Sequence, residues 1–259
     1  MSNIKGQVAI VTGSAVGIGA AIAFELASQG AHVAIADINP QSAAQTLSLI
    51  SAAGGIASTV HHDVTNWESC VRMVEEVERT LGAVSILVNN AGVSKRVPLL
   101  EMDEAEWDRV MDINLKGQFL TIRAVAPGML KRQYGRIINL ASVVSKKGYG
   151  NFSHYCSSKF GILGLTQSLA AEFATEGVTV NAVCPGIVMT PLHDKIVEEM
   201  AAAAGYSVEE AIRDFVANVP QKRPQTAQDI ARMVVFLAAP EAVNMTGGSY
   251  HVDGGMVMD

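Results

Sequence analysis

The chain has 259 residues, of which 49% are apolar and 5% aromatic, so it can bury a sizeable core and fits one domain better than two. Its formal charge of −6 argues against a broad nucleic-acid surface. Cys70, Cys156 and Cys184 are odd in number and far apart, which indicates neither a disulfide framework nor a metal site. The first apolar run is too short for a signal peptide or a membrane span, so we expect a cytoplasmic protein with no membrane partner.

Short apolar runs alternate with segments of helical periodicity along the whole chain. The runs predict strands near 7–12, 32–36, 56–61, 84–89, 135–141, 178–183 and 249–253. The segments between them predict helices near 17–29, 40–53, 66–81, 103–132, 152–176 and 226–238. This alternation is typical of an α/β protein with a single-domain Rossmann fold, in which a doubly wound, seven-stranded parallel sheet has helices on both faces.

One segment departs from this alternation. About 30 residues, 191–220, stand where a short loop between strand and helix would suffice. They contain two amphipathic helical patterns joined through Gly205. We expect this insertion to act as a lid over the substrate within a domain that spans 1–259, and simple packing between subunits is the alternative.

The first predicted strand leads into a glycine-rich turn, Thr12-Gly13-Ser14-Ala15-Val16-Gly17-Ile18-Gly19, and a helical pattern follows at once. Glycines at such a turn allow a pyrophosphate to approach the backbone N–H groups of the helix N-terminus. A plain tight turn is the alternative, but the strand before and the helix after favour a dinucleotide. The expected cofactor contacts in this turn are Gly13, Ser14, Gly17, Ile18 and Gly19.

The second predicted strand is followed by Asp37, whose carboxylate could accept hydrogen bonds from the ribose hydroxyls of adenosine. The same charge would repel a 2′-phosphate, and positions 14–15 and 38–39 hold no Lys or Arg to bind one. The sequence therefore favours NAD over NADP as the cofactor. A role for Asp37 as the N-cap of the helix that starts at Pro40 is the alternative.

Polar residues also follow the central strands of the predicted sheet. Ser142 comes after the strand near 135–141, and Asn89-Asn90-Ala91-Gly92 comes at the end of the strand near 84–89. Tyr155 and Lys159 stand four residues apart on one face of a predicted helix. Because the carboxyl ends of parallel strands meet at one edge of the sheet, we expect these groups to converge there.

Together these motifs resemble the short-chain dehydrogenase/reductase family. They are T-G-x-x-x-G-x-G at 12–19, Asp63-Val64, N-N-A-G at 89–92, Asn114, Ser142, Y-x-x-x-K at 155–159 and Pro185-Gly186, in the family's order and spacing. The resemblance implies that Tyr155 is the acid/base, Ser142 orients the substrate oxygen, Lys159 binds the nicotinamide ribose and Asn114 completes a water-linked proton relay. Further implied cofactor contacts are Asp63, Val64, Asn90, Ala91, Gly92, Pro185, Gly186, Val188 and Thr190. Implied substrate contacts are Ser142, Val144, Asn151, Tyr155, Gly186, Leu192 and His193.

The chemistry expected of Tyr155 requires a change in its acidity. A phenol has a pKa of roughly 10, and lowering it to ~7 needs about 4 kcal/mol of stabilisation of the phenolate. One ammonium at ~4 Å in an effective dielectric of ~20 supplies about that much. We therefore expect Lys159, helped by the positive charge of an oxidised nicotinamide ring, to make Tyr155 more acidic.

The segment Cys184–Val188 with Thr190-Pro191, and the segment Asp253–Asp259, are similar to those of the polyol and acetoin/butanediol dehydrogenase branch of this family. We therefore expect an NAD-dependent oxidoreductase that interconverts a secondary alcohol (a polyol, vicinal diol or hydroxyketone) and its ketone. A 3-oxoacyl-thioester reductase, which usually prefers NADPH, is one alternative. A non-catalytic NAD-binding scaffold or redox sensor is another. The resemblance also implies a homotetramer built through the helices near 103–132 and 152–176 and the last strand.

Two histidines lie beside these motifs. His154 precedes Tyr155, and His193 lies in the insertion, so either could touch the substrate. A histidine in such a place is as well explained as a wall of the pocket or a surface group. The sequence alone leaves both interpretations open.

Overall fold

The computed structural model describes residues 3–189, 201 and 205–258. Within them, seven parallel strands form one sheet in the order β3-β2-β1-β4-β5-β6-β7. The strands are β1 (Val8–Thr12), β2 (His32–Asp37), β3 (Ile56–His61), β4 (Val84–Asn89), β5 (Gly135–Leu140), β6 (Val178–Pro185) and β7 (Ser249–Val252). The predicted fold class, a doubly wound Rossmann fold in one domain, is therefore confirmed. β1, β5 and β6 are buried along their whole length, which explains why β1 is an almost uninterrupted apolar run and why β5 and β6 are mainly apolar.

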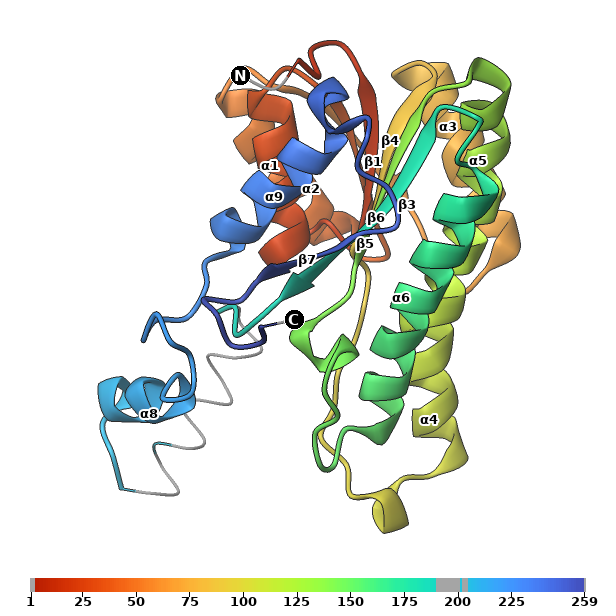
Figure 1. The fold of residues 1–259 in the computed structure, drawn as a ribbon. Coiled ribbons are helices and arrows are strands. Elements are labelled where there is room, and N and C mark those ends of the chain that lie inside the picture. Colours follow the sequence, from red (N-terminus) through yellow and green to blue (C-terminus); the bar gives the residue numbers. More distant parts are fainter. Residues whose placement is uncertain (1–2, 190–200, 202–204, 259) are drawn as a thin grey trace.

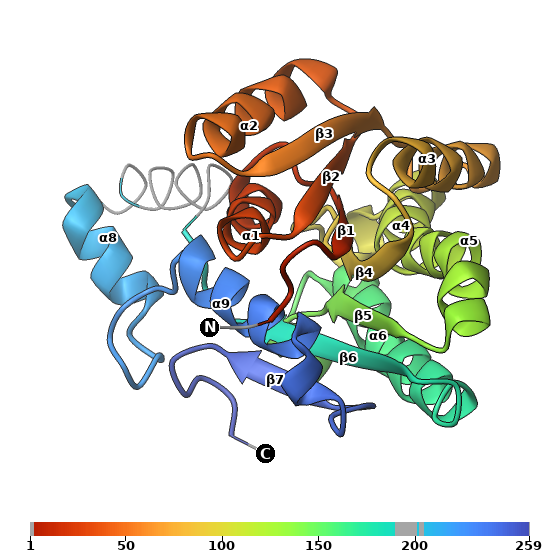
Figure 2. The same cartoon turned by 90° about the horizontal axis from the view of Figure 1, so that it is seen from above.

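Helices cover both faces of the sheet (Figures 1 and 2). One face carries α1 (Gly17–Ser28), α2 (Pro40–Ala52) and α9 (Ala227–Ala238). The other carries α3 (Trp67–Thr80), α4 (Glu104–Met111), α5 (Gly117–Arg132) and α6 (Ser153–Glu172). Each layer buries its own apolar cluster against the sheet, with Leu26 and Val234 on the first side and Met73 and Met129 on the second.

The single helix predicted near 103–132 is interrupted in the structure. After α4, residues Asp112–Lys116 form a turn of π-helix, and α5 begins at Gly117. Single π turns inside helices are frequent at functional sites, because the extra residue redirects a side chain. Here the π turn contains Asn114, which is fully buried. Apolar periodicity cannot predict such a turn, since it arises from the tertiary contacts of this residue.

The insertion is described in part. Helix α8 (Val208–Phe215) corresponds to the second amphipathic pattern, and Val216 and Val219 after it are buried. The first pattern, which includes Leu192, lies outside the described residues. The residues that flank the insertion lie side by side, because the Gln225 N–H donates to the Ile187 carbonyl oxygen at 2.7 Å.

Candidate active site

The polar residues expected at the site gather at the carboxyl edge of the sheet. This edge faces downward in Figure 1, between α8 on one side and the first turns of α4 and α6 on the other. The loop after β4 is bonded to the loop after β1: the Asn90 side-chain amide donates to the carbonyl oxygens of Thr12 (3.0 Å) and Gly13 (2.8 Å). The Thr12 hydroxyl oxygen in turn accepts the N–H groups of Asn90 and Ala91. The N-N-A-G motif therefore holds the glycine-rich turn in place.

The glycine-rich turn has the properties that a pyrophosphate requires. Gly13 and Gly17 have φ values of +62° and +61°, which side chains other than glycine rarely adopt. A methyl group on Gly19 would collide with the Gly13 carbonyl oxygen. The N-cap of α1, Val16, provides no side-chain hydrogen bond, and the first turn of the helix contains no acid. Its N–H groups and positive dipole end are thus available to an anion, so these residues fit a dinucleotide phosphate.

Asp37 lies beside this turn rather than serving as a helix cap. Its carboxylate accepts the Ala15 N–H and the Asn39 N–H, both at 2.9 Å. Asn39 is the N-cap of α2, with its side chain accepting the Ser42 N–H, so the N-cap alternative for Asp37 is wrong. A negative charge therefore stands at the carboxyl end of β2, next to the phosphate turn, where an adenosine ribose would lie.

Asp63 follows β3 on the same edge. Burial raises the pKa of Asp63, but hydrogen bonds from the Thr65 hydroxyl (2.7 Å) and N–H (2.9 Å) outweigh this and hold it below its usual value. Val64 is buried and packs against Gly117, where a methyl group would meet its side chain at 2.8 Å. The contact between Val64 and Gly117 thus joins the loop after β3 to α5.

The neighbouring His62 gives the first testable prediction, which concerns stability in acid. Burial lowers the pKa of His62 to about 4 from 6.5, against an opposing effect of Asp63. Between these two values the unfolded chain binds more protons than the folded protein, so the free energy of unfolding decreases as the pH falls through this window. We expect His62→Gln to lose less stability in acid than the wild type, measured as urea midpoints at pH values above and below the window.

His61 provides a matched control, because it stands next to His62 but is exposed. His61→Gln is expected to keep the wild-type loss of stability in acid. Equal acid sensitivity of His62→Gln and the wild type would contradict the prediction.

Tyr155, Ser142 and Lys159 come together at the carboxyl end of β5. Ser142 follows this strand, and its hydroxyl is hydrogen-bonded to the Tyr155 side chain. The Lys159 ammonium lies over the Tyr155 ring, 5.7 Å from its centroid, and donates to the Leu140 carbonyl oxygen at 2.8 Å. Lys159 is buried and Tyr155 is partly accessible, so the phenol is the group of the three that a substrate can reach most readily.

The acidity of Tyr155 differs from the sequence-based expectation. Burial raises the pKa of Tyr155, and the hydrogen bond with Ser142 offsets this only in part. Burial also lowers the pKa of Lys159, to about 8. In the protein by itself the Tyr155 pKa is therefore raised rather than lowered, because the effect of burial is the larger. The expected fall, which includes the charge of an oxidised nicotinamide ring, stays a prediction. A phenol that keeps its proton is suited to donate it to a carbonyl oxygen.

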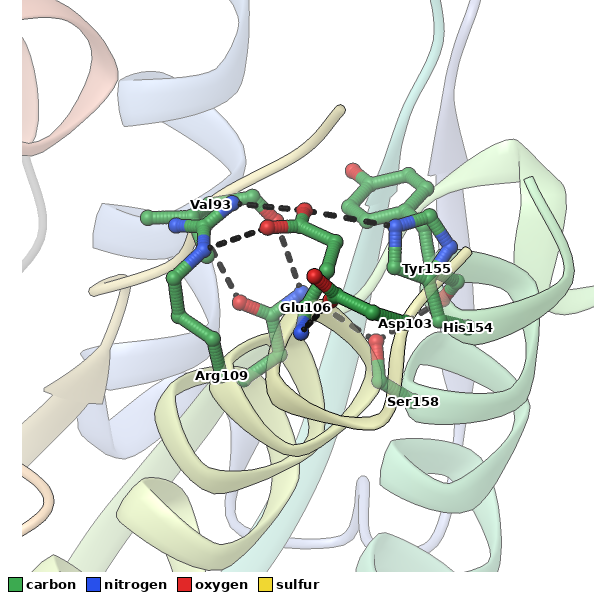
Figure 3. A network of polar contacts seen from close by, with 8 residues as sticks. Val93, Asp103, Glu106, Arg109, His154, Tyr155 and Ser158 are labelled. Carbon is green, nitrogen blue, oxygen red and sulfur yellow. Dashed lines mark hydrogen bonds and ion pairs between the residues drawn. The ribbon is translucent and has the colours of Figure 1, made fainter. Parts of the chain in front are cut away.

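Asn114 is held by three hydrogen bonds of its side chain. Its oxygen accepts the Val93 N–H at 2.8 Å, while its nitrogen donates to the Val93 carbonyl oxygen at 2.9 Å and to the Ser158 hydroxyl at 3.1 Å. Ser158 in turn donates to the Tyr155 carbonyl oxygen at 2.8 Å, as Figure 3 shows. Both N–H groups of the side chain are thus engaged, and the role of Asn114 in a water relay stays a prediction. Sequence reasoning missed Ser158, which no motif marks.

The remaining residues predicted for the site have contacts of several kinds. Val144 lies two residues after Ser142, and its N–H donates to the Ser142 hydroxyl oxygen at 3.3 Å. Asn151 is exposed, and its carbonyl oxygen accepts the Val97 N–H at 2.9 Å. Gly92 lies next to Asn114, and a methyl group on Gly186 would meet the Gln225 side chain at 2.5 Å. Pro185 ends β6, Val188 is buried, and Ser14 and Ile18 lie in and after the phosphate turn. The predicted contacts Thr190, Leu192 and His193 lie outside the described residues.

The described residues contain no group of His, Cys, Asp and Glu side chains arranged to hold a metal ion. All three cysteines are buried, and none of them forms a disulfide. In the same part of the chain, none of the helices is both long enough and apolar enough to cross a membrane.

A parallel sheet with a glycine-rich phosphate turn, and a Ser, Tyr and Lys group at the same edge, define an oxidoreductase of the Rossmann type. The family model described as short chain dehydrogenase matches residues 7–201. This protein belongs to that family, and it is accordingly an oxidoreductase that binds a nicotinamide cofactor.

Similar proteins extend over the whole chain. The 3-oxoacyl-(acyl-carrier-protein) reductase FabG of Vibrio cholerae is 40% identical over 256 residues, 99% of this chain and 99% of the relative. The enzyme of that name from Escherichia coli is 38% identical over 256 residues, with the same shares covered. A crystal structure from Agrobacterium tumefaciens, provisionally described as a gluconate dehydrogenase, has a TM-score of 0.91 and 34% identity, covering 98% of both chains.

These relatives correct the substrate expected from the sequence. Curated proteins that match at 36% to 40% identity over nearly the full length carry the name of a 3-oxoacyl reductase. The prediction of a polyol, diol or hydroxyketone dehydrogenase is therefore wrong, and the alternative of a 3-oxoacyl-thioester reductase is favoured. The likeness of two short segments to the polyol and acetoin/butanediol branch carried too little information to identify a substrate.

Proposed function

We propose that this protein reduces the 3-oxo group of an acyl thioester to a 3-hydroxyl group. The observation that carries this proposal is the near full-length identity with proteins named as 3-oxoacyl-(acyl-carrier-protein) reductases. The Tyr155 phenol is the group at this site that can act as the acid in reduction of a ketone.

A reduced nicotinamide cofactor, when bound, would supply hydride chemistry for carbon 3 of the substrate. Ser142 donates a hydrogen bond to the 3-oxo oxygen and so fixes the carbonyl next to Tyr155. Tyr155 transfers its proton to that oxygen as the C–O bond becomes single, and the product is a secondary alcohol. The positive charge of Lys159, which lies over the Tyr155 ring, would stabilise the phenolate that remains, and proton uptake from solvent restores the phenol.

The groups proposed to hold the cofactor lie in three places. Gly13, Ser14, Gly17, Ile18 and Gly19 would contact the pyrophosphate, and Asp37, Asp63 and Val64 the adenosine. Asn90, Ala91, Gly92, Pro185, Gly186, Val188 and Thr190, with Tyr155 and Lys159, would lie along the nicotinamide half. Within the described part of the chain, the hydrogen bonds of Asn90 support an indirect contribution, since its amide holds the phosphate turn.

A preference for NADH over NADPH is also part of the proposal, and it depends on Asp37. The carboxylate would accept the ribose hydroxyls and repel a 2′-phosphate. We expect Asp37→Asn, which keeps the shape and removes the charge, to shift the ratio of NADPH to NADH affinity toward NADPH by about tenfold or more. Fluorescence titration with both reduced cofactors measures this ratio. A wild type that already binds NADPH more tightly, or an unchanged ratio, would contradict the preference.

Two features of the assembly remain proposals. Trp107, Phe119 and Phe160 are large apolar residues exposed on α4, α5 and α6, which is consistent with a homotetramer built through these helices. Light scattering tests this. The segment 191–220 is proposed as a lid over the substrate, since the residues that flank it, Ile187 and Gln225, are hydrogen-bonded to each other next to Gly186.

Comparison of substrate classes tests the proposed activity. Acetoacetyl and longer 3-oxoacyl thioesters are assayed with NADH and with NADPH, next to sugar alcohols, diols and gluconate assayed with the oxidised cofactors. We expect kcat/KM for the thioesters to exceed that for every alcohol by about 100-fold or more. Turnover confined to sugar alcohols, diols or gluconate would contradict the proposal.

A further inference from the structure

The residue before Tyr155 is a completely buried histidine. The His154 side chain has 0% exposure, and neither of its ring nitrogens has a hydrogen-bond partner among the described residues. Its Nε2 atom lies 3.6 Å from the Glu106 Oε1 atom (Figure 3). Buried polar groups in folded proteins are nearly always hydrogen-bonded, so an imidazole in this state calls for an explanation.

Glu106 is itself held in a fixed position on α4. Its two oxygens accept a forked pair of hydrogen bonds from Arg109, at 2.9 Å and 2.8 Å, and its N–H donates to the Asp103 side chain at 2.8 Å. The hydrogen bond from Arg109, together with the charges of Arg109 and Lys95, lowers the pKa of the Glu106 carboxyl. A charged carboxylate is therefore directed at the imidazole of His154.

This contact joins the same two elements as the hydrogen bonds of Asn114. Helix α4 continues into the π turn that contains Asn114, and Asn114 is bonded through Ser158 to the Tyr155 carbonyl oxygen. Glu106 meets α6 at His154, one residue before Tyr155. Two contacts from the α4 side thus flank the backbone of Tyr155. At 3.6 Å the Glu106 contact is slightly longer than a hydrogen bond, and a shift of a few tenths of an ångström would make it one.

We propose that Glu106 and His154 form a positioning pair that fixes α6 against α4 and thereby places the Tyr155 phenol at the reacting carbonyl. His154 does not touch the substrate in this role, because it is buried. The pair acts through the position of Tyr155, so the inference rests on the proposed role of that residue. Misplacement of a catalytic group by about 1 Å can lower a rate about 100-fold, so even partial release of the contact is measurable.

Two variants of nearly equal shape test the role of the imidazole. His154→Gln keeps an N–H donor that can reach Glu106, whereas His154→Met fills a similar volume without one. We expect His154→Gln to keep kcat within about twofold of the wild type and His154→Met to lower it about tenfold, with the cofactor KM unchanged in both. If the two variants lose kcat equally, or if neither does, the imidazole acts only by filling space and the proposal is overturned.

The role of the Glu106 carboxylate is tested with a separate variant. This variant keeps the proposal testable even if His154→Met does not fold. Glu106→Gln is expected to lower kcat about tenfold, and the Glu106→Gln, His154→Met double variant should be no worse than either single one, because both remove the interaction of a charged carboxylate with the imidazole. Asp108→Asn is the matched control, since Asp108 is an exposed carboxylate on the same helix. Additive losses in the double variant would overturn the proposal.

Hydrogen exchange separates failure of this inference from failure of the proposed activity, because it needs no substrate. We expect faster exchange of the π-turn amides, 112–116, in Glu106→Gln and His154→Met, and wild-type exchange in His154→Gln and Asp108→Asn. Unchanged exchange in the first two variants would overturn the positioning pair. A wild type that reduces no 3-oxoacyl thioester would contradict the proposed function without altering this exchange pattern.

Discussion

Tyr155→Phe is expected to lower kcat for reduction of a 3-oxoacyl thioester by about a thousandfold while leaving cofactor affinity within about twofold. The variant removes only the phenol oxygen, which is hydrogen-bonded to Ser142 and is the proposed proton donor. Phenylalanine keeps the ring that packs over Lys159, so binding and folding should persist. Steady-state kinetics and a fluorescence titration with the reduced cofactor measure the two quantities.

A second tyrosine controls for the loss of a phenol as such. Tyr134 donates a hydrogen bond to the Gln7 side chain at 3.1 Å, at the opposite edge of the sheet, and Tyr134→Phe should keep wild-type kcat. A Tyr155→Phe enzyme with near wild-type kcat would show that another group supplies the proton.

Lys159→Met is expected to lower kcat about 100-fold and also to change how stability depends on pH. Burial lowers the pKa of Lys159 to about 8 from 10.5. Between these values the unfolded chain binds more protons than the folded protein, so the Lys159 contribution makes the free energy of unfolding increase with pH across this window. Methionine cannot titrate, so the increase attributable to Lys159 should be absent in the variant.

Urea unfolding of both proteins at several pH values from about 7.5 to about 10.5 measures this difference, and other titrating groups cancel in the comparison. Below the window the variant should be at least as stable as the wild type, because it removes a buried charge, although it leaves the Leu140 carbonyl oxygen without its donor. Parallel pH profiles for the two proteins would contradict the lowered pKa of Lys159.

The fold could be predicted because local patterns determine it. The buried strand β1 is an apolar run, and apolar residues recur at helical spacing in the helices. The turn at 12–19 contains glycines where positive φ values are needed. The ends of helices and strands were predicted less accurately. The helix predicted near 152–176 ends at Glu172, and the strand predicted near 178–183 extends to Pro185. Such ends depend on capping and neighbouring strands, which apolar periodicity does not describe.

The site could be predicted only in part. The motifs predicted that Ser142, Tyr155 and Lys159 lie together. The hydrogen-bond partner of Lys159 is the main-chain oxygen of Leu140, which no motif could indicate. Glu106 and Ser158 were missed because their roles arise from the packing of α4 on α6. The predicted substrate class was wrong for a related reason. The acid/base chemistry is common to the family, whereas substrate selectivity depends on the shape of the pocket.

A single-turnover reaction with product identification tests the proposed chemistry most directly. The wild-type protein is loaded with reduced nicotinamide cofactor and mixed with acetoacetyl thioester, and the products are identified by mass spectrometry. We expect one 3-hydroxyacyl thioester for each nicotinamide oxidised, and no such product from Tyr155→Phe on the same timescale. Unchanged thioester, in a sample that readily oxidises a sugar alcohol when given the oxidised cofactor, would contradict the proposed function.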